Sequence, residues 1–362
     1  YKLAESVLKV IGEKRVPVAM AIIGYIVSIP VFADSGFIIL SPLNKALTKK
    51  AKLSLACTAV ALGLGLMASH ALVPPTPGPI AAAGILNANL GLVIFWGIIV
   101  SLLGLIPGVI FAIKIASKTY IDPNPEISEE LLKSRSKDAP GAFISFLPIF
   151  VPIILIVFKS FNDYGKYLTE GRLFDIISFL GMPVIALLVG LAFALLLPKK
   201  LERKMLSTEG WVGKALKEAA IIIMITGAGG VFGKVLQNSG IAEVIGVALE
   251  GRSLGIWLPF IIAAAIKTAQ GSSTVAMITA ASIIAPMLGT LGFTSDLSVA
   301  FCVLAIGTGS MVVSHANDSF FWVITQMTGM DVATGYRLHS LGTGIVGVSS
   351  ILVIYILSMI FV

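Results

Sequence analysis

Five ionisable residues lie inside long apolar stretches of the sequence: Asp34, His70, Lys267, His315 and Asp318. A charged side chain in the middle of a bilayer costs about 3 kcal/mol on insertion scales, and such residues usually line a binding site or an ion pathway. A lysine can neutralise an anionic ligand, and an imidazole titrates near neutral pH. These residue types therefore indicate a site for a small anion, for a proton, or for both.

Polar and glycine-rich motifs surround these residues and interrupt four apolar blocks. Non-helical backbone is tolerated at membrane depth only inside protein or beside a water-filled cavity. Broken helices would present N–H groups to anions and carbonyl groups to cations, so we predict one midplane site formed by all four breaks. The breaks are 30–36 in block 16–48, 74–79 in block 53–87, 270–274 in block 254–288, and 315–318 in block 297–332.

The predicted substrate-binding residues come from these breaks and from the motifs beside them. Four of them are also candidates for carrying a coupling proton: Asp34, Asp318, His70 and His315. No catalytic residue and no metal site is predicted. The predicted substrate-binding residues are Asp34, Ser35, Gly36, Ser69, His70, Thr76, Gly78, Lys267, Gln270, Gly271, Ser272, Ser273, Thr274, Ser314, His315, Asn317 and Asp318.

Each candidate also has a structural interpretation. Asp34 suits a helix cap, and Lys267 could be a lysine that snorkels to the membrane surface. A histidine in a break could pin the broken helix by hydrogen bonding, and the proline run 74–79 could be a plain kink. The glycine-rich run 227–230 breaks a span at 219–236 and favours close helix packing. His339, at a predicted membrane interface, is expected to be structural.

Composition places these motifs in a membrane protein. The chain is 57% hydrophobic and only 12% charged, against about 25% charged residues in soluble domains, and its mean hydropathy is +0.98. The net charge of +7 lies largely in basic loops beside apolar spans, which mark a cytoplasmic face and do not require nucleic acid. Cys57 and Cys302 lie in apolar runs without metal-binding spacing.

An internal repeat organises the chain. Asp34-Ser35-Gly36 aligns with Ser272-Ser273-Thr274, Ser69-His70-Ala71 aligns with Ser314-His315-Ala316, and Ala4-Glu5 aligns with Ala242-Glu243. The segment after the first hairpin contains several lysines, whereas its counterpart at 288–297 contains no Lys or Arg, so the two repeats are predicted to be inverted. We therefore predict an all-α polytopic membrane protein with two inverted repeats, each with a re-entrant helical hairpin and a broken transmembrane helix.

The predicted domains follow from this repeat. The spans that precede the second hairpin have no counterpart before the first hairpin. Because the sequence also opens without Met, we expect about 90 upstream residues to be absent from it. Loops 43–52, 117–141 and 198–217 are predicted to be cytoplasmic and the C-terminus to lie outside. The first repeat is 1–116 (amphipathic arm, hairpin 16–48, broken helix 53–87, span 90–116), 117–141 is a loop, and the second repeat is 142–362 (scaffold spans 142–158 and 173–197, span 219–236, hairpin 254–288, broken helix 297–332, span 337–362).

The two long motifs at 69–79 and 314–322 resemble the paired signature motifs of the gluconate permease family. Residues 271–275 with Ala280-Ala281 are similar to that family's second hairpin, and 32–37 to its first. The resemblance covers essentially the whole chain. It departs from the family at Asp34, where many members have Glu, and at Thr76, where many have His, and both changes bear on substrate preference and on the coupling ion.

The resemblance implies a transporter of the bacterial cytoplasmic membrane and not an enzyme. It implies proton symport of gluconate or a related sugar acid by alternating access, no cofactor, a small anionic substrate and a homodimer in the lipid bilayer. Uptake of D-serine or glycerate, or coupling to Na⁺, are the alternatives within transport. A passive channel and an intramembrane hydrolase are alternatives from other classes, but adjacent Ser-His pairs on a helix point about 100° apart and make poor catalytic dyads.

Overall fold

The computed structural model describes residues 12, 15–124, 141–165, 168, 170–198, 201–239 and 254–362. All regular secondary structure within these ranges is helical, as the sequence predicts. Four helical segments of this part of the chain are long and apolar enough to cross a membrane, and a bent pair would make a fifth. The protein is therefore an integral membrane protein made of helices.

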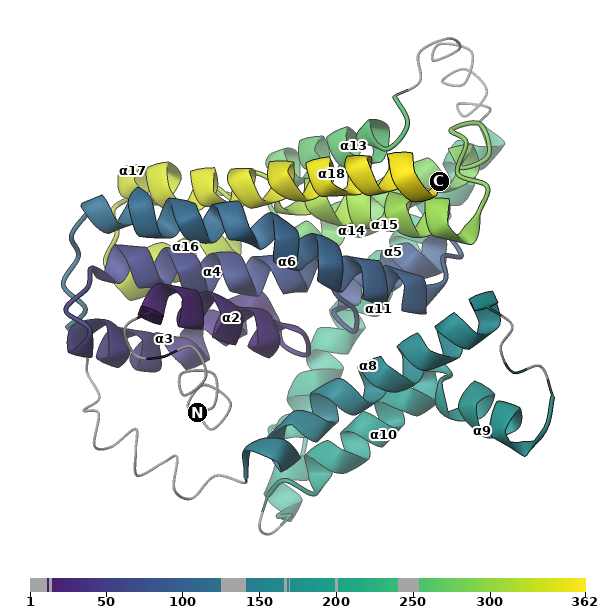
Figure 1. Cartoon of the computed structure of the whole chain (residues 1–362), viewed down its shortest axis with the longest axis horizontal. Helices are drawn as coiled ribbons and strands as arrows, with labels where there is room; N and C mark the ends of the chain where they lie inside the picture. Colours follow the sequence, from purple (N-terminus) through teal and green to yellow (C-terminus); the bar gives the residue numbers. More distant parts are fainter. Residues whose placement is uncertain are drawn as a thin grey trace.

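The helices fall into two groups, a main bundle and a smaller group beside it (Figure 1). The bundle contains α2 (Val16–Ser28), α3 (Ala33–Lys50), α4 (Leu55–Leu72), α5 (Pro77–Ile85), α6 (Leu90–Lys114), α13 (Trp257–Gln270), α14 (Ser273–Ile284), α15 (Asp296–Met311), α16 (Ser319–Thr328), α17 (Val332–Gly335), the π-helix η5 (Tyr336–Ser340) and α18 (Leu341–Phe361). The other group contains α8 (Ala142–Gly165), α9 (Arg172–Leu180) and α10 (Pro183–Leu195). Helix α11 (Trp211–Asn238) packs against α14 of the bundle. 3₁₀ turns lie at Ala116–Lys118, Arg203–Leu206 and Ala285–Met287.

Helices α4 and α15 form the centre of the bundle, and glycines let their neighbours approach closely. Every residue of α4 is buried. A Cβ atom at Gly65 would lie 2.0 Å from the Ala21 carbonyl oxygen of α2, and one at Gly309 would lie 2.2 Å from the Phe260 carbonyl oxygen of α13. Small residues at helix contacts compensate for the weak hydrophobic drive to associate inside a membrane.

Corresponding helices of the two predicted repeats pack in corresponding ways. Helix α2 packs on α4 as α13 packs on α15, and α6 packs on α4 as α18 packs on α15. The halves also exchange contacts, because α16 packs against α3 and α5 against α14. Figure 1 shows α6 and α18 side by side along the length of the bundle. This arrangement brings the two sets of breaks together.

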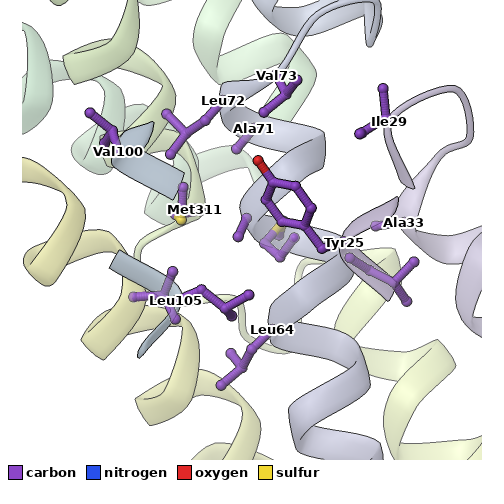
Figure 2. Packing of buried hydrophobic residues seen from close by; sticks show 14 of the residues in the cluster. Tyr25, Ile29, Ala33, Leu64, Ala71, Leu72, Val73, Val100, Leu105 and Met311 are labelled. Carbon is purple, nitrogen blue, oxygen red and sulfur yellow. The ribbon is translucent and has the colours of Figure 1, made fainter. Parts of the chain in front are cut away.

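A continuous apolar core fills the space between these helices. Figure 2 shows Tyr25 of α2 close to Ala71 and Val73 at the end of α4. The Tyr25 hydroxyl is hydrogen-bonded to Ser101 Oγ of α6 at 2.8 Å, which satisfies both polar groups within the core. Val100 and Leu105 of α6 belong to the same buried cluster. The core therefore joins α2, α4 and α6 into one body.

The smaller group is attached to the bundle where α8 meets α6. A Cβ atom at Gly91 of α6 would lie 2.1 Å from Ser160 Cβ of α8. The expected span 173–197 consists of two helices, α9 and α10, which form a pair bent by 73°. Pro183 is at the start of α10, where its ring prevents the preceding residue from continuing a helix.

Three expected breaks differ in detail from the structure. The first break covers Ile29–Phe32, so Asp34 and Gly36 lie in the first turn of α3 and not in a loop. In the second break Pro77 and Pro79 begin α5, which is consistent with the tolerance of proline in a first helical turn. The predicted interruption at 227–230 is wrong, because α11 is helical throughout that run.

Some expectations fall on residues outside the described ranges. These are the alignment of Ala4-Glu5 with Ala242-Glu243, the amphipathic arm before Val16 and most of the loop 117–141. The described start of that loop contacts the beginning of α4, since Ser54 Oγ donates to the Thr119 carbonyl at 2.6 Å. Arg337 also donates to Thr119 Oγ1 at 3.2 Å. Residues 54, 119 and 337 thus share one end of the bundle.

Candidate functional site

A cavity of about 480 Å³ lies where the starts of α3, α14 and α16 meet the end of α4. The first turn of a helix has backbone N–H groups without partners inside the helix, and the helix dipole adds positive potential there. Three such ends, two from the second half and one from the first, converge on one space. The cavity is lined by Phe32, Ala33, Asp34, Ser35, Met67, His70, Gln270, Gly271, Ser272, Ser273, Thr274, Val275, Asn317, Asp318, Ser319 and Phe320.

The first turn of α3 contributes the carboxylate of Asp34. This side chain is half-buried, and its Oδ2 atom accepts a hydrogen bond from Ser319 Oγ of α16 at 2.6 Å. No side chain caps the start of α3, so backbone N–H groups of its first turn have no acceptor within the helix. Asp34 therefore links the two halves at the wall of the cavity.

The break between α13 and α14 is a tight turn at Gly271-Ser272. Gly271 has φ +91°, and a Cβ atom there would lie 2.1 Å from the Asn317 carbonyl oxygen, so only glycine fits. Ser272 caps α14, its Oγ accepting from the Val275 N–H at 3.3 Å. Ser273 and Thr274 follow in the first turn of α14 and line the cavity.

A buried ion pair lies behind the cavity wall. Lys267 Nζ donates to Asp318 Oδ2 at 2.6 Å, and the two side chains are 1% and 6% exposed. The Lys267 ammonium also donates to the Gly271 carbonyl at the end of α13. Asp318 caps α16, since its Oδ1 accepts from the Phe320 N–H at 3.1 Å. The pair therefore fixes the turn after α13 to the start of α16.

Asp318 is held from its other side by a hydrogen-bonded chain. Ser314 Oγ donates its single hydroxyl hydrogen to Asp318 Oδ2. In its contact with His339 Nε2, at 3.1 Å, Ser314 Oγ must therefore be the acceptor and the imidazole N–H the donor. The His339 ring is fully buried within the bundle. Its predicted structural role agrees with this contact, through which it orients the residues that hold Asp318.

The two histidines at matched repeat positions have different surroundings. His70 is in the last turn of α4, is 6% exposed and lines the cavity. Its Nδ1 atom has no hydrogen-bond partner among the described residues, and its ring lies 5.7 Å from that of Phe32. His315 is in the break after α15, is not a lining residue, and donates from Nε2 to the Thr268 carbonyl at 3.1 Å.

Ten of the predicted site residues line the cavity and seven do not. Those that line it are Asp34, Ser35, His70, Gln270, Gly271, Ser272, Ser273, Thr274, Asn317 and Asp318. Those that lie elsewhere are Gly36, Ser69, Thr76, Gly78, Lys267, Ser314 and His315.

The residues outside the cavity support its walls. Ser69 and Thr76 are buried and donate to backbone carbonyls nearby in the chain. Gly78 allows α5 to approach α14, because a Cβ atom there would lie 2.1 Å from Met277 Cε. A Cβ atom at Gly36 would likewise lie 2.6 Å from Leu66 Cδ2. Gly36 and Gly78 thus lie where the flexible ends of Leu66 and Met277 pack against the helices of the site.

Sequence reasoning missed six lining residues: Phe32, Ala33, Met67, Val275, Ser319 and Phe320. Ser319 had a detectable signal, since its hydroxyl directly follows the predicted site residue Asp318 within the motif at 314–322. The others are apolar. Phe32, Ala33, Val275 and Phe320 lie within the motifs at 32–37, 271–275 and 314–322, but their side chains carry no polar group that would mark them as ligands, and Met67 lies outside these motifs.

The family model of GntP family permeases matches residues 1–360. The chain belongs to the GntP permease family. It is 37% identical to an uncharacterised permease of Haemophilus influenzae over 97% of this chain and 75% of the relative. It is also 32% identical to a gluconate permease of Pseudomonas aeruginosa (99% of this chain, 80% of the relative), and 30% identical to a D-serine transporter of Escherichia coli (95% and 77%).

Proposed function

We propose that this GntP family member is a secondary transporter that imports a small hydroxylated carboxylate, with gluconate or a related sugar acid as the first candidate, by proton symport. The observation that carries this proposal is the convergence of three helix N-termini on one polar cavity. Anions bind at helix N-termini because N–H groups and the positive dipole end both face them. Gluconate and D-serine, which relatives are named for, both carry a carboxylate and at least one hydroxyl.

The lining residues suit both parts of such a substrate. Backbone N–H groups in the first turns of α3 and α14, together with the Ser273 and Thr274 hydroxyls, would hold the carboxylate. The amides of Asn317 and Gln270, with the hydroxyl of Ser35, would bind substrate hydroxyls. Asn317 Nδ2 already donates to the Thr268 carbonyl at 2.9 Å, which leaves its amide oxygen free to accept from a ligand.

The charges around the cavity favour coupling to a proton. Lys267 and Asp318 neutralise each other, so an ionised Asp34 would leave the site negative and would repel a carboxylate. Protonation of Asp34 removes this repulsion and gives the side chain a donor. A substrate anion and one proton would therefore bind together, with Asp34 as the proton carrier and His70 as a direct ligand.

The paired breaks also support two inverted repeats with re-entrant hairpins. Helices α2, α13 and α14 contain 13, 14 and 12 residues, whereas a membrane-spanning helix needs about 20. The corresponding packing of α2 on α4 and of α13 on α15 is consistent with a common ancestral unit. Alternating access would then move the hairpins against a scaffold that contains α8, α9 and α10, in a dimer in the bacterial inner membrane.

Transport by the chain in proteoliposomes tests this proposal. We expect gluconate to accumulate when the external solution is more acidic than the lumen, and accumulation to stop when a protonophore removes the gradient. Asp34→Asn should abolish the response to the gradient, while Asp163→Asn, at an exposed site in α8, should not. Uptake that ignores the pH gradient would exclude proton coupling, and absence of binding and uptake for every small carboxylate would exclude the transport proposal.

A further inference from the structure

The Lys267 ammonium is surrounded in the way that a small bound cation would be. Two of its donors go to the carbonyl oxygen of Gly271, at the C-terminal end of α13, and to the carboxylate of Asp318. The C-terminal end of a helix carries negative potential. Carbonyls at the ends of broken helices, together with carboxylates, are the ligands that bind Na⁺ in transporters with discontinuous helices.

Lys267 does not serve as an open ligand for the substrate in this structure. Its side chain is 1% exposed and is absent from the cavity lining, although Gly271 and Asp318, its two partners, both line the cavity. The ammonium therefore does not contact the cavity but joins two segments that the substrate would touch, the turn at Gly271 and the start of α16 at Asp318. A bound Na⁺ in the place of the ammonium would join the same two segments.

The two corresponding positions of the first half hold no ion pair. Counting from the alignment of Asp34 with Ser272, the position of Lys267 corresponds to Ile29; counting from that of Ser69 with Ser314, the position of Asp318 corresponds to Val73. Ile29 and Val73 are 3% and 0% exposed and belong to the apolar core (Figure 2). The fold thus does not need an ion pair at this point in order to form a break.

We propose that Lys267 is a built-in cation, which occupies the place where the end of α13 and the Asp318 carboxylate would otherwise bind Na⁺, and that it makes substrate binding independent of sodium. This inference rests on the proposed function for its substrate, but it concerns the Lys267 ammonium, which does not line the cavity. The Lys267 ammonium then positions the end of α13 against Asp318, and a small monovalent cation is the ligand that could replace the ammonium.

Calorimetric binding of gluconate to the purified chain at neutral pH tests the wild-type protein. We expect the same affinity in sodium chloride and in choline chloride of equal ionic strength. A requirement for sodium would overturn the inference, because the built-in charge would then be insufficient. If neither gluconate nor D-serine binds in any salt, the proposed function fails, and the stability measurements below still test the inference.

The variant Lys267→Ala creates the vacancy. It lacks the atoms from Cγ to Nζ, which propylammonium reproduces. In choline chloride we expect gluconate affinity to fall by about tenfold or more and the unfolding temperature to fall with it. Added sodium or propylammonium should restore both, whereas tetramethylammonium, which has no N–H donor and is too large to bind close to the carboxylate, should restore neither. Lys217→Ala, at an exposed lysine, is the matched control and should show no cation response.

A second variant separates a cation site from general destabilisation. Lys267→Met with Asp318→Asn has neither charge, so no unpaired carboxylate remains to bind a cation. We expect its unfolding temperature to be insensitive to sodium and propylammonium. A change in the unfolding temperature of this double variant on adding either cation would overturn the inference. The inference would also be overturned if neither cation restored the stability and gluconate affinity of Lys267→Ala, whether or not that variant folds in choline chloride.

Discussion

The two halves of the site have similar helices, but different residues stabilise the helix breaks in each half. In the second half a buried Lys267–Asp318 ion pair joins the end of α13 to the start of α16. At the corresponding positions the first half has Ile29 and Val73, which are packed in the apolar core. The first half instead carries one half-buried carboxylate, Asp34, at the start of α3. In the proposed function this difference separates two roles: a neutral, fixed ion pair on one side of the cavity, and on the other a single carboxylate that carries the proton.

The largest effect that this comparison predicts is on stability. Asp318→Asn would leave the Lys267 ammonium buried without its counter-charge, and breaking such a pair costs about 3–5 kcal/mol. Ile29→Val, at the first-half position that corresponds to Lys267, the other member of the pair, removes one methyl group and should cost about 0.5–1.5 kcal/mol. Unfolding of both variants in detergent, followed by circular dichroism, measures the difference. Equal losses would show that the pair is no more important to the fold than its apolar counterpart.

A smaller effect is expected at the turn before α14. Gly271→Ala would place a Cβ atom 2.1 Å from the Asn317 carbonyl oxygen at φ +91°, and such strain costs about 1–3 kcal/mol. Because the strain falls between two lining segments, gluconate affinity should fall together with stability. Gly289→Ala is a suitable control, since a Cβ atom there would meet nothing within 4 Å. An unchanged affinity for Gly271→Ala would mean that the turn does not shape the site.

The smallest effect distinguishes the two matched histidines. We expect His70→Ala to weaken substrate binding by about tenfold, equivalent to about 1.4 kcal/mol, because this ring lines the cavity and its Nδ1 is unpartnered among the described residues. His315→Ala should change affinity less, since that ring is used to hold the Thr268 carbonyl. Titration of both purified variants with gluconate decides between them. A larger loss for His315→Ala would reverse the assignment.

Much of this arrangement could be predicted from sequence because breaks in apolar blocks carry strong local signals. Prolines 74–79 and the Gly271-Ser272 turn indicate where helices must end, and the matched Ser-His-Ala motifs relate the two halves. Residues from three of the four predicted breaks, 30–36, 270–274 and 315–318, line one cavity, whereas no residue of the break 74–79 lines it.

Other features could not be predicted because they depend on tertiary contacts. The sequence places Lys267 near a break, but only the packing of α13 on α15 and the Lys267–Asp318 contact show that its ammonium faces Asp318 and not the cavity. The environments of His70 and His315 differ although their motifs match, because α4 remains helical through His70 whereas α15 ends before His315. The bend between α9 and α10 was missed because apolar residues continue through it.

A structure of the purified chain with gluconate bound would test the central claim most directly. We predict density for the carboxylate at the first turns of α3 and α14, with the rest of the molecule reaching Asn317 and His70. A second, apolar cavity of about 440 Å³ lies between Pro30 and Pro75 of the bundle and Pro152 of α8. Gluconate found there, or at any place away from the three helix starts, would contradict the account.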